Sequence, residues 1–269
     1  MFIKVGVETI PPLTLAAGRL LLAAVLLAWY AAGSGYRLWG NYRLWGVFLF
    51  IGFFGNALPF TLIGWGELRI DSGLAAILIG IMPITTAVLA HLFTQDEPLR
   101  AGRLLGILTG FAGLIVLVGW NSIAGPRTEM LSQLAVLSGA ISYAVTTVFA
   151  RRHVHIPGRV LAAGATGAGA LLITPLALIF ERPWALAPSL HSAGALVMLA
   201  VFSTALATIV FFHLIKAVGA TTFSQVNYLT PVMGLLWGII LLGERPGWYA
   251  LIALALILAG IALVNRPAP

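Results

Sequence analysis

The sequence predicts an all-α membrane protein with ten transmembrane helices, the first one truncated, arranged as two inverted five-helix repeats. Three observations lead to this fold class. Hydrophobic residues make up 60% of the chain and charged residues only 9%, with a mean hydropathy of +1.02, so it cannot cover a water-facing surface over its whole length. Long apolar runs recur along the chain, and its second half repeats features of the first. Together these features favour a bilayer as the surroundings of the chain.

Nine uncharged or nearly uncharged runs have the length, about 20 residues, that a helix needs to cross the hydrocarbon core. They cover residues 13–33, 44–65, 72–93, 104–120, 131–150, 160–180, 193–214, 221–242 and 248–264. The residues before Glu8 are apolar but too few to cross alone. In the alignment of the two halves Met1 matches Thr147, so we expect the first helix to lack roughly fifteen residues that its counterpart has.

Internal repetition defines the predicted domains. Pro83 recurs 148 positions later as Pro231, and features that begin at Ile10 recur at an offset of 146. An offset that drifts so little indicates a duplicated unit. We expect a first repeat at residues 1–120, a linker at 121–130 and a second repeat at 131–266. Because each repeat has five spans, an odd number, the second enters the membrane from the opposite side, an arrangement typical of alternating access.

Cationic loops orient the protein. The loops after the even-numbered spans and the C-terminal tail hold nine Lys or Arg residues, whereas the opposite side holds five. Since such an excess marks the cytoplasmic face, we expect both termini in the cytoplasm and the protein in a bacterial inner membrane. Cationic loops beside anionic lipid explain the net charge of +7, so the expected partners are the bilayer and a small-molecule substrate, with no nucleic acid. The oligomeric state is left open, with a monomer favoured.

Catalytic and metal-binding patterns are missing from the sequence. All eight Asp and Glu residues lie in or beside loops, whereas a carboxylate inside a span is the usual carrier of a proton or cation. The chain has no Cys, no His pair at metal-ligand spacing and no serine-nucleophile motif. We therefore expect no enzyme, no catalytic residue, no metal and no cofactor. His91 and His213 lie near span ends and are interpreted as interfacial polar residues and not as proton carriers.

Arg19 is the one clear charge inside a predicted span. Its side chain either binds a substrate carboxylate or reaches the outer membrane interface or helix-end carbonyls. The second interpretation is favoured.

Polar residues at membrane depth must find partners in the protein or in cavity water. Several follow the three-to-four spacing of one helix face and predict a central uncharged cavity, although hydrogen bonding between packed helices is the alternative for each Ser or Thr taken singly. The substrate-binding candidates are Asn56, Phe60, Met82, Thr85, Thr86, Tyr143, Thr146, Thr204, Thr208, Asn227, Tyr228 and Trp237.

Two prolines and a row of small residues predict mechanical roles. Pro83 and Pro231 each remove a backbone donor inside a span, which bends the helix and frees a carbonyl, and their pairing across the repeats predicts a hinge at each. Small residues every fourth position allow close contact between helices. They predict that the fifth span packs against the tenth, with a dimer interface as the alternative, through Gly102, Gly106, Gly110, Ala255 and Ala259.

Three stretches carry a resemblance to a known family: residues 3–19, 73–83 and 216–244. They look like parts of EamA-type domains of the drug/metabolite transporter superfamily, and the resemblance covers almost the whole chain as two units. By overall pattern, and not by a diagnostic motif, the chain most resembles the YddG-type exporters of aromatic and other amino acids. The tryptophan-glycine stretch that usually opens the first helix is absent.

The resemblance implies export of small metabolites, amino acids including aromatic ones, by alternating access. Two alternatives stay open. One is export of drugs or other metabolites within the same superfamily, and the other is a passive channel.

Overall fold

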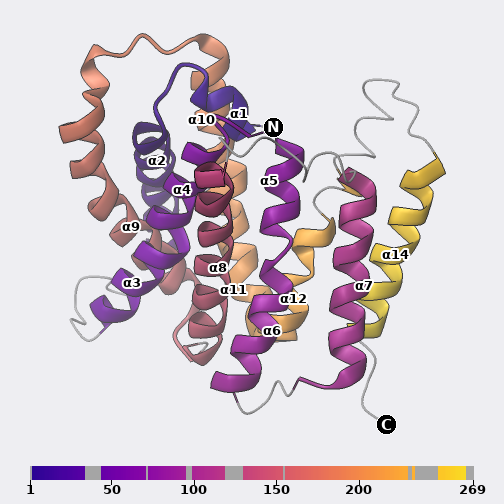
Figure 1. The fold of residues 1–269 in the computed structure, drawn as a ribbon. Coiled ribbons are helices and arrows are strands. Elements are labelled where there is room, and N and C mark those ends of the chain that lie inside the picture. Colours follow the sequence, from indigo (N-terminus) through magenta and orange to yellow (C-terminus); the bar gives the residue numbers. More distant parts are fainter. Residues whose placement is uncertain are drawn as a thin grey trace.

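A computed structural model of the protein describes residues 2–33, 44–70, 72–94, 99–118, 130–153, 155–229, 232–233 and 248–264. Every regular element within these ranges is helical, which confirms the all-α prediction. Figure 1 shows that most of the helices run roughly side by side along one direction of the molecule.

The first half of the chain forms α1 (Phe2–Val7), α2 (Pro12–Ala32), α3 (Trp45–Gly52), the π-helical turn η3 (Phe53–Ala57), α4 (Leu58–Gly66), α5 (Ser72–Ile79), α6 (Met82–Phe93) and α7 (Ala101–Val118). The second half forms α8 (Met130–Arg152), α9 (Gly158–Glu181), the 3₁₀ turn η6 (Pro183–Ala185), α10 (Leu190–Ala200), the π-helical turn η7 (Val201–Leu206), α11 (Ala207–Val218), α12 (Ala220–Ser224) and α14 (Trp248–Val264).

Among the described residues, six helical stretches are long and apolar enough to cross a membrane: Pro12–Ala32, Trp45–Gly66, Leu74–Phe93, Met130–Arg152, Gly158–Glu181 and Leu190–Val218. Two shorter apolar helices, Ala101–Leu117 and Trp248–Val264, lie where further spans are predicted. Half of the ninth predicted span, residues 221–242, lies outside the described residues. The α1 helix, at the start of the described residues, is six residues long.

The predicted span at residues 72–93, the fourth in the ten-helix count, is interrupted in the structure and not merely bent. The α5 helix ends at Ile79, and α6 begins at Met82 with Pro83 in its first turn. Because proline has no N–H group, the Ile79 carbonyl lacks the donor that a continuous helix would supply four residues later. The break therefore lies at the predicted hinge of the first half. Pro231, the hinge predicted for the second half, lies outside the described residues.

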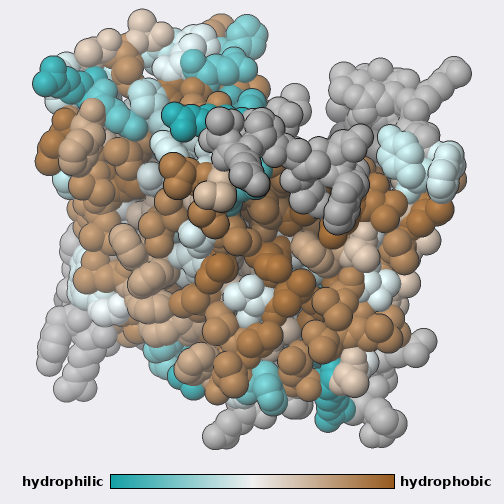
Figure 2. All heavy atoms as spheres, viewed as in Figure 1, coloured by the Kyte–Doolittle hydropathy of each residue, from teal (hydrophilic) through white to brown (hydrophobic). Residues whose placement is uncertain are grey.

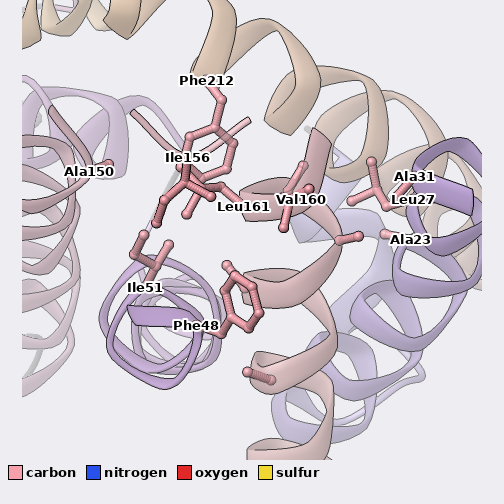
Figure 3. Close-up of a cluster of buried hydrophobic side chains, with 14 of the residues drawn as sticks. Ala23, Leu27, Ala31, Phe48, Ile51, Ala150, Ile156, Val160, Leu161 and Phe212 are labelled. Carbon is pink, nitrogen blue, oxygen red and sulfur yellow. The ribbon is translucent and has the colours of Figure 1, made fainter. Parts of the chain in front are cut away.

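Apolar side chains fill the contacts between the helices and also cover their outer faces. In the cluster drawn in Figure 3, Phe48 and Ile51 of α3 meet Leu161 of α9 and Phe212 of α11. Figure 2 shows apolar side chains over the middle of one face of the molecule and polar ones toward its ends. An apolar middle between polar ends is the surface that a bilayer requires.

The α7 and α14 helices pack against each other, as predicted for the fifth and tenth spans, through the predicted Gly106 and Gly110 but otherwise through different small residues. A Cβ atom on Gly106 would lie 2.7 Å from the carbonyl oxygen of Gly260, whereas one on Gly102 would meet nothing within 4 Å. Ala255 and Ala259 are exposed. The prediction was wrong for Gly102 and for both alanines, because an apolar stripe looks alike in sequence whether it faces lipid or a helix.

Candidate functional site

Arg19 lies on α2, whose start is fixed by the end of α9. The Glu181 carboxylate accepts hydrogen bonds from the backbone N–H groups of Leu13 and Thr14, at 3.0 and 2.6 Å, and from the Thr14 hydroxyl at 2.7 Å. These bonds satisfy donors that a helix start leaves without an intrahelical partner, and a carboxylate there also complements the helix dipole. Arg19 follows about two turns further along, at a depth of roughly 10 Å into the helix.

The Arg19 side chain is buried, with 5% of its surface exposed. Its Nε and Nη2 atoms both donate hydrogen bonds to the hydroxyl of Thr204, at 3.0 and 2.9 Å, and its guanidinium carbon lies 3.7 Å from the ring centroid of Phe60. An arginine that reaches the membrane interface or a helix end would not make these contacts. The interpretation favoured from sequence was therefore wrong, because Arg19 points into the protein.

Arg19 has no ion pair with any described carboxylate, since its polar contacts there are the two with Thr204. Removing a guanidinium from water costs several kcal/mol, and a single neutral hydroxyl offsets only part of that cost. A face of an aromatic ring adds about 2 kcal/mol at a desolvated site. The environment of Arg19 is consequently electropositive and incompletely compensated.

Thr204 belongs to the π-helical turn η7, and its hydroxyl donates to the carbonyl of Leu199 at 2.9 Å while it accepts from Arg19. The other π-helical turn, η3, holds Asn56, whose side-chain amide lies 3.5 Å from the carbonyl of Ala165 on α9. Single π-helical turns inside α-helices occur frequently at functional sites. Both turns place a buried polar side chain at the middle of a span.

The α8 helix completes this group from another side. Its Ser142 hydroxyl donates to the carbonyl of Phe54, in η3, at 2.6 Å, and the ring of Tyr143 meets that of Phe60 edge to face with centroids 6.3 Å apart. Thr146 packs against Gly55, and its hydroxyl has no hydrogen-bond partner among the described residues. The helices α4 and α8 and the turn η7 thus bring Phe60, Tyr143 and Thr204 to Arg19, while other residues of α8 pack on η3.

A second group of predicted residues lies beside the helix break. The side-chain amide of Asn227 donates to the Met82 sulfur at 3.1 Å and to the Ser224 carbonyl at 3.0 Å. Thr85 binds the carbonyl of Ile81 one turn earlier, at 3.2 Å. Thr86 is fully buried, and its hydroxyl has no partner within the described ranges.

The structure thus sorts the predicted residues. It brings Phe60, Tyr143 and Thr204 to Arg19, whereas Asn56 meets Ala165 and Thr146 meets Gly55. Beside the break between α5 and α6 it places Met82, Thr85, Thr86 and Asn227.

Two predicted residues lie elsewhere. Tyr228 is fully buried against α7, where its hydroxyl donates to the Ile107 carbonyl at 3.1 Å and its ring packs on Gly110. Thr208 is half-buried on α11. Trp237 lies outside the described residues.

The residue missing from the predicted set is Arg19 itself. Its sequence signal was plain, a charge inside an apolar run, but position alone does not distinguish an arginine that reaches the interface from a buried one.

Comparison with known proteins gives a consistent result. The model of a family described as the EamA-like transporter family matches residues 1–119 and 130–266. An uncharacterized inner membrane transporter of Escherichia coli (strain K12), YedA, is 29% identical over 98% of this chain and 84% of its own. The uncharacterized transporter YoaV of Bacillus subtilis (strain 168) is 24% identical over 96% of this chain and 88% of its own.

One relative has a name that states a substrate. A probable terminal-alkyne amino-acid exporter of Streptantibioticus cattleyicolor is 27% identical over 98% of this chain and 87% of its own. Among solved structures, a protein crystal structure aligns with 97% of this chain and 90% of its own at a TM-score of 0.79 and 23% identity, which shows a shared fold.

Proposed function

Because this chain belongs to the EamA-like transporter family, we propose that it exports small metabolites, amino acids including aromatic ones, across a bacterial inner membrane by alternating access. The observation that carries the proposal is the buried polar and aromatic group at Arg19, to which α2, α4, α8 and the π-helical turn η7 contribute. Ionisable residues inside membrane spans usually mark a substrate or ion pathway. The relative named as an amino-acid exporter supports the substrate class, and the YddG-type resemblance supports its aromatic members.

We also propose that ten spans form two inverted repeats, which is the symmetry that alternating access uses. Under the predicted offsets of 146 and 148, Arg19 corresponds to Ala165 and Asn56 corresponds to Thr204. A two-fold relation between the halves then makes the contact of Arg19 with Thr204 the counterpart of the contact of Asn56 with Ala165. The structure contains both contacts. Each joins a helix of one half to a π-helical turn of the other: α2 meets η7, and α9 meets η3.

The packing of α7 on α14 supports the same relation. At an offset of 147, Gly106 corresponds to Ala253 and Gly113 to Gly260. The close approach of Gly106 to the Gly260 carbonyl has its counterpart in that of Gly113 to the Ala253 carbonyl, at 2.7 and 2.9 Å from the ideal Cβ positions. The two helices therefore meet in an arrangement close to self-complementary.

A third pair of contacts lies at helix ends. The Lys4 ammonium donates to the Glu67 carbonyl at 3.0 Å, just after α4, and Arg151 donates to the Ile215 carbonyl at 3.2 Å, near the end of α11. In the sequence, Lys4 and Arg151 are 147 positions apart, and Glu67 and Ile215 are 148 positions apart. Cations at helix C-termini satisfy the last carbonyls and complement the dipole, so the same stabilising device recurs in both halves.

Counterflow in liposomes tests the proposed function. Purified protein is reconstituted, vesicles are loaded with unlabelled phenylalanine or leucine, and entry of the labelled amino acid is followed. A carrier gives saturable entry that is stimulated by the internal substrate. A passive channel gives entry without that stimulation, and drug or metabolite export gives counterflow with other compounds but none with amino acids. Either of the last two outcomes would contradict the proposal.

A further inference from the structure

We propose that the guanidinium of Arg19 binds the carboxylate of the transported molecule, so that the protein recognises α-amino acids through their acid group. This inference rests on the proposed export of amino acids and assigns the atoms that would select them. It follows from the charge, the geometry and the surroundings of Arg19.

The first step is the missing counter-charge. Arg19 is almost completely buried, and within the part of the chain that the structure describes no Asp or Glu pairs with it. A buried charge without an opposite charge is strongly unfavourable, whereas an anion that arrives at it recovers much of the cost. A substrate carboxylate supplies that anion in the loaded state.

The second step is the supply of free donors. A guanidinium has five N–H groups in a planar fork. The Thr204 hydroxyl accepts one hydrogen bond from Nε and one from Nη2. The remaining three lie on Nη1 and Nη2, along an edge that matches the two oxygen atoms of a carboxylate. Phe60 covers the face of the guanidinium and Thr204 holds one of its edges, so the fork is fixed before the ligand binds.

The third step excludes a purely structural role. The predicted counterpart of Arg19 in the other half is Ala165, which meets Asn56 through its backbone carbonyl. That contact joins a helix to a π-helical turn without any charge. Because one half packs with an alanine at this position, packing does not require the arginine in the other half.

The neighbouring rings define the remainder of the ligand. Phe60 and Tyr143 meet edge to face beside the guanidinium, and such rings pack favourably against an apolar or aromatic side chain. The expected ligand is therefore an amino acid with an apolar or aromatic side chain, held at its carboxylate by Arg19.

The test compares three ligands that differ only in their charged groups. Phenylalanine carries both groups, 3-phenylpropionate keeps the carboxylate alone, and phenethylamine keeps the ammonium alone. Leucine, 4-methylpentanoate and isoamylamine form a second set. Binding is measured by ligand-dependent thermal unfolding of the purified protein in detergent, and Kd is obtained from titrations. Phenylalanine or leucine, and the matching acid, should raise Tm in a saturable way, whereas the matching amine should not.

Three variants locate the effect. Arg19→Gln removes the charge and should abolish the ligand-induced shift, while the ligand-free Tm stays equal or rises because an uncompensated buried cation is gone. Arg19→Lys keeps the charge but loses the planar fork, so binding should weaken at least about tenfold. Arg69→Gln is the matched control. It makes the same substitution at an exposed arginine just after the C-terminal end of α4, and it should leave Kd unchanged.

The outcomes separate this inference from the proposed function. It is overturned if the amines bind as well as the amino acids, if Arg19→Lys and Arg19→Gln bind with the affinity of the unchanged protein, or if no carboxylate binds at all. Counterflow of amino acids that persists in Arg19→Gln would overturn the inference alone. If the acids without an ammonium bind through Arg19 but no amino acid gives counterflow, the inference stands and the proposed function fails.

Discussion

Gly106 and Gly260 bring the backbones of α7 and α14 together at a single point: a Cβ atom on either residue would lie within 2.6 to 2.7 Å of the carbonyl oxygen of the other. Real Cβ atoms do not approach backbone oxygen so closely, so a side chain at either position forces the helices apart. Helices in a membrane are held by such packing and not by the hydrophobic effect.

Gly106→Leu should therefore destabilise the protein by about 1–3 kcal/mol through overpacking, without a change in substrate preference. Gly102→Leu is the matched control, because its Cβ meets nothing within 4 Å, and it should change stability by no more than about 0.5 kcal/mol. Thermal unfolding in detergent measures both. Equal destabilisation by the two substitutions, or a well-folded Gly106→Leu variant with altered selectivity, would contradict this account.

Pro83→Ala gives residue 83 a backbone N–H that can donate to the Ile79 carbonyl. The helix should then continue from α5 into α6 with less interruption. If this break is a hinge, folding survives and counterflow slows several-fold. Pro175→Ala is the control, because Pro175 lies inside α9 without interrupting it. Normal transport by Pro83→Ala would show that the break is only structural.

The two prolines make a further distinction possible. If the halves exchange shapes, Pro83→Ala and Pro231→Ala should favour opposite facing states. Single cysteines introduced on the two sides of the membrane in this naturally cysteine-free chain report the facing state by their reactivity toward a membrane-impermeant maleimide. Opposite shifts in reactivity are expected, and unchanged reactivity in both variants would reject the hinge interpretation.

Transport should depend little on a proton gradient, changing by less than about twofold, because no described span holds a carboxylate between its ends to carry the proton. The histidines near span ends do not fit that role: His91 accepts a hydrogen bond from the Leu99 backbone at 3.2 Å, and His213 is exposed. Flux is measured in liposomes with and without an imposed pH difference. Concentrative uptake driven by pH alone, and lost in His91→Ala or His213→Ala, would show that a histidine carries the proton.

Glu181→Ala should loosen the start of α2, because the carboxylate accepts from the backbone of Leu13 and Thr14 and from the Thr14 hydroxyl. Loss of a helix N-terminal cap costs about 1–2 kcal/mol, which thermal unfolding detects. Glu8→Ala is the control, because it removes an exposed carboxylate that precedes α2 in the sequence, and it should leave Tm almost unchanged. A Tm of Glu181→Ala equal to that of the unchanged protein would mean that water replaces the cap.

The sequence by itself determined that this protein lies in a lipid bilayer and approximately where its helices run. An apolar run of span length has few options other than a helix in a bilayer, since lipid offers no partner to an open backbone. Pro83 likewise marked the interruption of the fourth span, because a proline removes a backbone donor wherever it stands. These features depend on local chemistry, so they are readable without knowledge of the fold.

Only the tertiary structure decided which faces of the helices meet. On α14 the residues that contact α7 include Ala253, Ile257 and Gly260, whereas the sequence favoured Ala255 and Ala259. In a soluble protein the polar face of a helix would have distinguished the two stripes. In lipid both faces are apolar, and the pattern that separates inside from outside is lost.

Arg19 shows the same limit at the candidate site. Its charge was visible in the sequence, but its partners Thr204 and Phe60 come from other helices, one of them in the opposite half of the chain. Whether an arginine stem extends toward the interface or turns into the protein depends on what the neighbouring helices offer at that depth. The packing of α2 against η7 and α4 therefore decided that this cation is buried.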